Sequence, residues 1–337
     1  MGNMQQTKRR IGFIGAGGNA RGHMRNMMQV PGAQVVALAD PSPASLAAAV
    51  KVTGEGVSTY EDYRRMIAEE TLDGVVISTP HTLHYEQVMT CLDKGLHVLI
   101  EKPMTCTSAH ARDIIQKAAE TGKVVLIGYQ RHYEPRFRWV KKQIKDGLIG
   151  RVTFVQCFQS QNWLRSQQGK WRLDPALSGG GQLNDSGSHL VDIILWVTGL
   201  EADTVTAFVD KRGEAVDINS AVTVKFTNGA IGNISVVGDQ VANGFWEDII
   251  IAGEKGMIWL PHGGKVFVAN EAAMTPQEVT DFGDEPVTNK DQNFIDCING
   301  AAANEVPPIC GLKVIELTEA IWRSMDAEGL PVKVERS

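Results

Sequence analysis

The sequence of 337 residues lacks an apolar run of the roughly 20 residues that a membrane-spanning helix needs. Its first residues are polar and basic, and the short apolar stretch after them is broken by glycine, so we predict no signal peptide. The five cysteines are scattered, odd in number and never spaced as CxxC, which predicts reduced thiols in a cytoplasm and no metal framework. A basic block is also absent, and together with the net charge of −6 this argues against nucleic acid as a partner.

Internal repeats and low-complexity tracts are absent as well. What is present is an ordinary globular composition, 43% hydrophobic and 21% charged, in a chain long enough for two domains of ~100–200 residues each. In the first half, helical stretches separate apolar strands at 11–14, 34–39, 72–78, 97–100 and 124–127. This alternation predicts an α/β domain, residues 1–128, with a doubly wound parallel sheet.

The glycine stretch IGFIGAGGNARGH, residues 11–23, is the feature around which this domain is organised. A short strand, a tight glycine turn and a helix start follow one another in the order of a dinucleotide-binding Rossmann unit. Gly15 permits the turn, Gly17 lets the backbone approach a pyrophosphate, and Ala20 is where helix packs on strand. The N–H groups at the helix N-terminus would bind the pyrophosphate. The cofactor-binding candidates here are Gly15, Gly17, Gly18, Asn19 and Ala20.

The second strand ends in Asp40, close to the expected ~20 residues beyond the motif for a group that binds the adenosine ribose. Its carboxylate would accept a hydrogen bond from the 2′-hydroxyl and repel a 2′-phosphate. Pro41 and Ser42 follow, without an adjacent arginine to hold such a phosphate. The sequence therefore predicts NAD as the cofactor, with NADP as the alternative.

From residue 129 onward the pattern changes, and the strands from residue 204 follow one another without intervening helices. Strands are expected at 152–158, 204–209, 220–226, 230–237, 246–252, 256–260 and 265–269, with helices at 137–146, 185–197 and 312–327. Asn228-Gly229 is a strong two-residue hairpin signal between two of these strands. We predict a second, α+β domain over residues 129–337 with a mostly antiparallel sheet. The final helix, 312–327, is a candidate to pack back on the first domain.

Two groups of residues are candidates for chemistry. Lys102 follows a parallel strand and could donate to a substrate oxygen, with a surface lysine as an equal alternative. Asp185 and His189 are four residues apart, so on a helix they would share a face. A neutral histidine, with its ordinary pKa of about 6.5, can take the proton from a hydroxyl as its carbon loses hydride. The alternative is that Asp185 caps the helix and His189 is a hydrogen-bonded core residue.

The polar loop 159–178 carries Trp163 and Trp171, which could stack on a sugar ring, and Arg165 and Arg172, which could bind hydroxyls or a cofactor phosphate. Equally, these side chains could cover the sheet or lie in a subunit contact. Elsewhere, His81 and His84 have a spacing that metal ligands use, but no third ligand is suitably placed, so we predict no metal site.

With these motifs in this order, nearly the whole chain resembles the Gfo/Idh/MocA oxidoreductases. The resemblance rests on the glycine motif, Thr79-Pro80 to His84, Glu101-Lys102-Pro103, residues 128–131 and residues 179–192. It implies a catalytic trio of Lys102, Asp185 and His189, an open second sheet used for a homodimer or homotetramer, and a sugar, inositol or related cyclic polyol as substrate. Further cofactor-binding residues are then expected at Thr79, Pro80, His84, Glu101, Lys102 and Gln130. Substrate-binding residues are expected at Lys102, Arg131, Trp163, Trp171, Arg172, Asp185, His189 and Trp246.

The implied mechanism has His189 accept the hydroxyl proton while hydride passes to nicotinamide, Lys102 hydrogen-bond the same oxygen, and Asp185 position the pair. Two alternatives remain open. One is NAD-dependent cleavage of a glycoside through a transient keto-sugar, which would show no net cofactor reduction. The other is a dinucleotide-binding regulator without activity, for which an acid/base set would serve no purpose.

Overall fold

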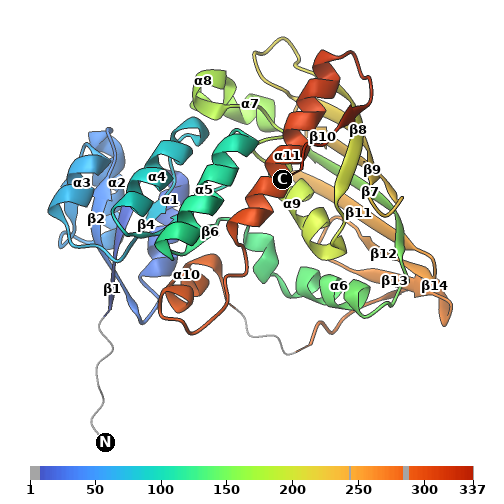
Figure 1. Ribbon diagram of the computed structural model, residues 1–337, viewed down its shortest axis with the longest axis horizontal. Helices are drawn as coiled ribbons and strands as arrows, with labels where there is room; N and C mark the ends of the chain where they lie inside the picture. The colour runs from blue at the N-terminus through green and yellow to red at the C-terminus, as the bar shows by residue number, and fades with distance from the viewer. Residues whose placement is uncertain (1–7, 243, 284–287, 337) are drawn as a thin grey trace, which may run out of the picture. The chain divides into compact units, whose positions relative to one another are not determined.

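The computed structural model describes residues 8–242, 244–283 and 288–336, which form two compact units (Figure 1). Unit 1 contains residues 8–105, 109–130 and 288–309. Unit 2 contains residues 106–108, the described part of 131–287, and 310–336. Across these described ranges, no helix combines the length and the hydropathy that a membrane span requires.

Unit 1 is built on a six-stranded parallel sheet with the order β3-β2-β1-β4-β5-β6. Its strands are β1 (Arg9–Ile14), β2 (Ala33–Ala39), β3 (Ser58–Tyr60), β4 (Gly74–Ile77), β5 (His97–Ile100) and β6 (Val125–Ile127). Its helices are α1 (Gly18–Met27), α2 (Pro43–Thr53), α3 (Tyr63–Glu69), α4 (His84–Asp93), α5 (Ser108–Thr121) and α10 (Lys290–Ile298). Because β1 lies between β2 and β4, the winding direction reverses there, and a crevice at such a reversal is where dinucleotides bind. The predicted doubly wound parallel sheet is confirmed.

The apolar core of unit 1 lies between β1 and the helices α1, α2 and α10. Phe13 on β1 packs in one cluster with Met24 and Met27 of α1 and with Phe294 of α10, all fully buried. Apolar side chains at a helical spacing on α1 and on α10 therefore meet the same sheet face. A segment from late in the chain thus completes the first unit.

The compact units differ from the predicted domains 1–128 and 129–337 chiefly in one late segment of the chain. Residues 288–309 belong to unit 1, because Phe294 and Ile295 of α10 are buried in its core. The final helix, α11 (Pro308–Asp326), lies in unit 2 from residue 310 onward, within the range predicted for the second domain, and its packing on the first domain stays a prediction. It is held there by hydrogen bonds: Ser324 Oγ accepts the N–H of Ala207 at 2.9 Å, and Trp322 Nε1 donates to Asp217 Oδ1 at 3.3 Å.

Unit 2 is built on a nine-stranded sheet with the order β14-β13-β12-β11-β7-β10-β9-β8-β15. All neighbours are antiparallel except β7 and β10, which confirms the predicted mostly antiparallel sheet. The strands are β7 (Val152–Gln161), β8 (Ala202–Asp210), β9 (Asn219–Phe226), β10 (Ile231–Val237), β11 (Phe245–Gly253), β12 (Gly256–Leu260), β13 (Phe267–Asn270), β14 (Ala273–Glu278) and β15 (Val332–Lys333). Beside α11, the helices are α6 (Pro135–Lys145), α7 (Trp163–Gln167), α8 (Pro175–Ser178) and α9 (Gly187–Thr198).

Helices α9 and α11 lie against one face of this sheet (Figure 1). Side chains alternate along β9 between buried and exposed, as expected where only one face is covered. The other face carries apolar side chains in neighbouring register positions, with Phe154 of β7 opposite Ile231 of β10. Phe208 on β8 is 68% exposed. This uncovered apolar face bears on the predicted assembly of the chain.

Replacing Gly15 with alanine is expected to destabilise unit 1 strongly. Gly15 has φ +94°, and a Cβ there would lie 2.4 Å from the carbonyl oxygen of Ser78. Backbone strain of about 1–3 kcal/mol and a comparable overpacking cost predict a loss of about 2–6 kcal/mol in unfolding free energy. The measurement is urea denaturation.

Gly22→Ala is the matched control, because Gly22 lies within α1 and a Cβ there meets no atom within 4 Å. That variant should gain about 0.5–1 kcal/mol from helix propensity. Equal denaturation midpoints for the two variants would contradict the prediction.

Candidate active site

The glycine turn of unit 1 offers an open backbone at the N-terminus of α1. Gly17 is the residue before the helix, and a Cβ there would meet no atom within 4 Å, so a ligand can come close to the chain. The first turn of α1 holds no acidic residue, which keeps its N–H groups available to an anion. Arg21, which the sequence patterns did not single out, donates to the carbonyl of Ala16 at 3.0 Å and brings a guanidinium to the same turn. These residues fit a bound pyrophosphate.

Asp40 ties the end of β2 to this turn. Its Oδ2 accepts the N–H of Ala16 at 2.7 Å, and its Oδ1 accepts the N–H of Ser42 at 2.8 Å. The carboxylate is thereby held in one orientation beside the glycine turn. This is the place that a ribose-binding acid occupies in a dinucleotide-binding unit.

His84 is fully buried at the ends of β4 and β5. Its Nδ1 lies 2.8 Å from the carbonyl oxygen of Pro103, and its Nε2 lies 3.1 Å from that of Thr79. Burial lowers the pKa of His84, which favours the neutral ring. His84 therefore connects two segments that follow parallel strands, Thr79-Pro80 and Glu101 to Pro103. Direct contacts of His84, Thr79 and Pro80 with a cofactor stay a prediction.

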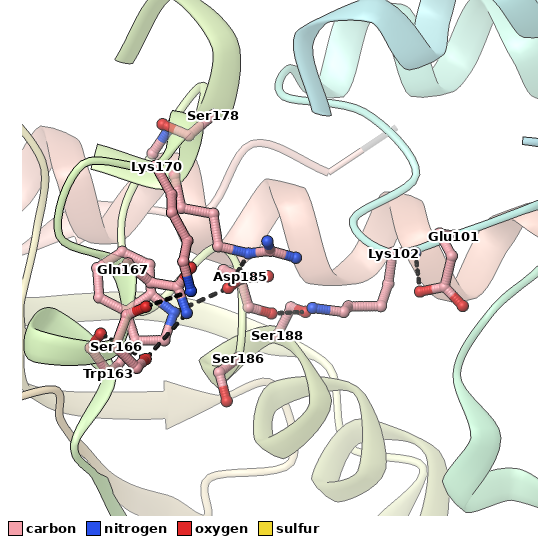
Figure 2. Close-up of polar contacts among 12 residues, drawn as sticks. Glu101, Lys102, Trp163, Ser166, Gln167, Lys170, Ser178, Asp185, Ser186 and Ser188 are labelled. Atoms are coloured by element: carbon pink, nitrogen blue, oxygen red, sulfur yellow. Dashed lines mark hydrogen bonds and ion pairs between the residues drawn. The ribbon is translucent and has the colours of Figure 1, made fainter. Parts of the chain in front are cut away.

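Lys102 stands two residues beyond the end of β5, directly after Glu101. Its backbone N–H donates to Glu101 Oε2 at 3.3 Å, and Figure 2 shows this contact at the strand end. Glu101 itself is buried and belongs to a charged network in unit 1 that is described below. Gln130, another predicted cofactor residue, is exposed and begins a short 3₁₀ turn at the end of unit 1.

In unit 2, Asp185 lies in the turn that leads into α9, rather than on the helix as the spacing had predicted. The helix begins at Gly187, with Ser186 at its N-cap. Asp185 Oδ2 accepts two hydrogen bonds, from Trp163 Nε1 at 2.8 Å and from Arg172 Nε at 2.8 Å, and Figure 2 shows Trp163 turned toward it. His189 follows in the first turn of α9 and is partly exposed. The carboxylate is thus oriented by two donors from the segment 159–178, which was predicted as a loop but contains the end of β7 and the short helices α7 and α8.

Trp163 and Arg172 hydrogen-bond to Asp185 instead of lining an open aromatic surface. Trp163 is 3% exposed and packs against Val216 and Ile218. The guanidinium of Arg172 lies 4.4 Å from the centre of the Trp171 ring while it donates to Asp185. Stacking of these tryptophans on a sugar stays a prediction.

Arg131 and Trp246 are not brought together. Arg131 is buried and its Nη2 lies 2.8 Å from Glu247 Oε2 on the covered side of β11. Trp246, one residue earlier, is 51% exposed and donates to Asp248 at 2.8 Å. Successive strand residues point to opposite faces, so Trp246 lies on the uncovered side.

The covered side also holds polar residues that the sequence patterns missed. Gln159 lies opposite Glu247 in register, and both Gln159 and Gln161 donate from their amides to Ser186 Oγ, next to Asp185. Alternation along β7 could have pointed to Gln159 and Gln161, since they fall on the same side as buried Cys157. Hydroxyl groups of a ligand could exchange hydrogen bonds with such amides.

A second missed group lies in unit 2, with two of its three members buried. Among the described residues, His132, Asp192 and Cys310 place three possible metal-ligating atoms within 4.8 Å of one another. His132 Nε2 lies 2.9 Å from Asp192 Oδ2, so these two already hydrogen-bond each other. Burial raises the pKa of Asp192 although His132 and the positive charge of Lys141 oppose this shift. The arrangement is that of a buried hydrogen-bonded pair beside a thiol.

The fold and the glycine turn define a dinucleotide-binding protein, and comparison with known proteins identifies the family to which it belongs. Residues 9–129 match the family profile described as an oxidoreductase family with an NAD-binding Rossmann fold, and residues 137–259 match the GFO/IDH/MocA C-terminal domain. The chain belongs to the Gfo/Idh/MocA oxidoreductase family, and its first domain is an NAD-binding Rossmann domain.

Several relatives have curated names. The rhizopine catabolism protein MocA of Rhizobium meliloti is 35% identical over 201 residues, which cover 58% of this chain and 59% of MocA. The inositol 2-dehydrogenase/D-chiro-inositol 3-dehydrogenase of Lactiplantibacillus plantarum is 25% identical over 88% of this chain and 84% of its own length.

Solved structures are similar along nearly the whole chain. A levoglucosan dehydrogenase in complex with NADH has a TM-score of 0.86 at 20% identity, over 98% of this chain and all of its own, and shows the fold alone. The aldose-aldose oxidoreductase from Caulobacter crescentus, complexed with glycerol, has a TM-score of 0.84 at 25% identity, over 97% of this chain and 99% of its own.

The anchoring of Asp185 can be tested by Trp163→Phe, which keeps an aromatic ring in the core and removes one donor. A hydrogen bond to a charged group contributes about 1.5–3 kcal/mol, so we expect kcat to fall by about tenfold or more. The measurement is steady-state kinetics beside thermal unfolding. Trp139→Phe, on α6, is the control and should keep its kcat; equal losses in both variants would contradict the anchoring role.

Proposed function

We propose that this chain is an NAD-dependent oxidoreductase that transfers hydride between a hydroxyl carbon of a sugar, inositol or related cyclic polyol and nicotinamide. One observation carries the proposal: Asp185, held by Trp163 and Arg172, stands four residues before a partly exposed histidine, His189. A dinucleotide-binding regulator would have no use for such an oriented acid/base pair. The names of the curated relatives, inositol dehydrogenases among them, support the substrate class.

In the proposed mechanism, bound NAD supplies the hydride acceptor, and this chain's side chains handle the proton. His189 accepts the hydroxyl proton as general base. Lys102 donates a hydrogen bond to the same oxygen and stabilises the negative charge that develops there. Asp185 orients the substrate hydroxyl and His189, and its own orientation comes from Trp163 and Arg172.

We further propose that the uncovered face of the nine-stranded sheet joins copies of this chain into a homodimer or homotetramer. Phe154, Ile231 and Phe208 would be removed from water there, which the hydrophobic effect favours. All five cysteines are free thiols in the structure, which supports the cytoplasm as the compartment.

The test is cofactor absorbance on the purified protein, with NAD and then NADP, against a panel of inositols, free sugars and glycosides. Substrate-dependent appearance of reduced cofactor is the expected result, and it names the substrate class. Consumption of a glycoside without net reduction would replace this proposal by redox-assisted cleavage. Cofactor binding without turnover of any compound, in the protein and in its His189→Ala variant alike, would point to a regulator.

A further inference from the structure

Four charged side chains come together in the interior of unit 1. They are His23 on α1, Glu101 after β5, and Lys290 and Asp291 at the start of α10. His23 is 2% exposed, Glu101 6% and Asp291 0%. Charges this deeply buried need partners, because the loss of hydration costs several kcal/mol for each ion.

The four side chains are linked into one network. His23 Nδ1 lies 2.5 Å from Asp291 Oδ1, and His23 Nε2 lies 2.9 Å from Glu101 Oε1. Lys290 Nζ also binds Glu101 Oε1. Asn26 completes the network by donating to Asp291 Oδ2 at 3.0 Å. Two anions therefore face one ammonium and one imidazole.

The electrostatics favour the charged forms of His23 and Glu101. Burial and the Lys290 charge act to lower the pKa of His23, but the carboxylates, above all Asp291, outweigh them and raise it. Burial acts to raise the pKa of Glu101, but Lys290 and His23 outweigh it and hold that pKa well below the usual range. With His23 protonated, the network is neutral as a whole and Glu101 is a carboxylate.

Glu101 connects this network to the backbone of Lys102. While Oε1 takes the two cations, Oε2 accepts the backbone N–H of Lys102 at 3.3 Å. The carboxylate has room only because position 128 is glycine, where a Cβ would lie 2.6 Å from Oε1. Lys290 also donates to the carbonyl of Gly128 at 3.4 Å. Glu101 is thus clamped between α10 and the strand end that carries Lys102.

We propose that Lys290, together with His23 and Asp291, is a positioning residue for Lys102: it fixes the Glu101 carboxylate that holds the backbone of Lys102. The inference rests on the proposed function, in which Lys102 donates to the reacting oxygen. A buried ion network is a poor source of stability compared with apolar packing, so a network at this strand end is better explained by what it orients. Helix α10, far from Lys102 in sequence, then serves catalysis.

The experiment compares Lys290→Met with Arg9→Met in the full chain. Arg9 Nε binds Asn299 Oδ1 at 2.8 Å, so its loss weakens the attachment of α10 without touching Glu101. Displacement of a catalytic group can lower the reaction rate about 100-fold. We therefore expect the kcat of Lys290→Met to fall by about 10- to 100-fold, with the Kd for NAD unchanged. Arg9→Met should keep its kcat.

The pH profile separates positioning from simple destabilisation. Without the Lys290 charge, the pKa of Glu101 rises toward its usual range, so the acidic limb of the kcat profile should move to higher pH in Lys290→Met only. Within the part of the chain that the structure describes, the titratable groups that act on Glu101 and His23 include Lys290, Asp291, Lys102 and His84. Equal losses of kcat in Lys290→Met and Arg9→Met, with the acidic limb of the pH profile at its wild-type position in both, would overturn the inference.

Hydrogen exchange of the Lys102 amide gives a readout that needs no turnover. We expect this amide to exchange faster in Lys290→Met and in Glu101→Gln than in wild type or Arg9→Met. If the wild type turned over no carbohydrate, the proposed function would fail while this measurement still decided the positioning role. Wild-type exchange at Lys102 in both variants would overturn the inference, whatever the activity.

Discussion

His189→Ala is expected to lower kcat by about 10²–10⁴-fold, the usual contribution of a general base, while the Kd for NAD stays unchanged. Alanine removes the group proposed to accept the hydroxyl proton. His189 lies in the first turn of α9 in unit 2, whereas the glycine turn and Asp40 lie in unit 1. Cofactor binding should therefore survive the substitution. The measurement is steady-state kinetics on the substrate that the absorbance panel identifies, with NAD binding measured separately.

Two further variants make the result specific to the base. Lys102→Met should also lower kcat, since it removes the donor to the developing charge. Because the two residues act as a unit, the increase in activation free energy in the double variant should be smaller than the sum of the increases in the two single variants. His110→Ala is the control: this histidine stacks on Tyr85 with ring centres 3.8 Å apart, and it has no role in the proposed chemistry. Wild-type turnover by His189→Ala would rule out the proposed base.

Asp40→Asn is expected to reduce the preference for NAD over NADP by about 10- to 100-fold, because a like charge placed against a carboxylate costs several kcal/mol. Asparagine keeps an oxygen that can accept the N–H of Ala16 or Ser42, but it removes the charge that would repel a 2′-phosphate. The wild-type protein should bind NAD more tightly than NADP. The measurement is the Kd for each cofactor by calorimetry.

The control for this change is Asp62→Asn, also in unit 1. The Asp62 side chain caps α3 by accepting the N–H of Arg64 at 2.9 Å, and it should leave the ratio of the two Kd values as it was. A wild-type protein that binds NADP more tightly, or a ratio that does not change in Asp40→Asn, would contradict the assigned role of Asp40.

Local patterns predicted the first unit well because its cofactor motif is local. Gly15, Gly17 and Asp40 lie within one strand-turn-helix-strand unit, where the spacing of residue types reflects backbone geometry. The structure adds a contact that the spacing could not show, the hydrogen bond from Ala16 to Asp40. The parallel sheet itself followed from the alternation of apolar strands with helical stretches.

Patterns failed where partners lie far apart in sequence. Helix α10 was not predicted, and its segment was assigned to the second domain, because nothing within residues 288–309 shows that Phe294 is buried in the same core cluster as Met24. The pairing of Glu101 with His23 and Lys290 also had no local signal, while the expected contact of Glu101 with the cofactor stays a prediction. Burial and pairing of charges depend on the whole fold.

The sequence by itself determined the class of fold, the family and NAD as the cofactor, since these depend on periodicity and on motifs of short span. Only the tertiary structure decided which side chains hold Asp185, which helix completes unit 1 and which face of the large sheet stays uncovered. The physical reason is that hydrogen bonds and apolar contacts form between side chains that folding brings together. Trp163 was predicted on a loop but begins α7, and its partner Asp185 comes from a turn 22 residues later.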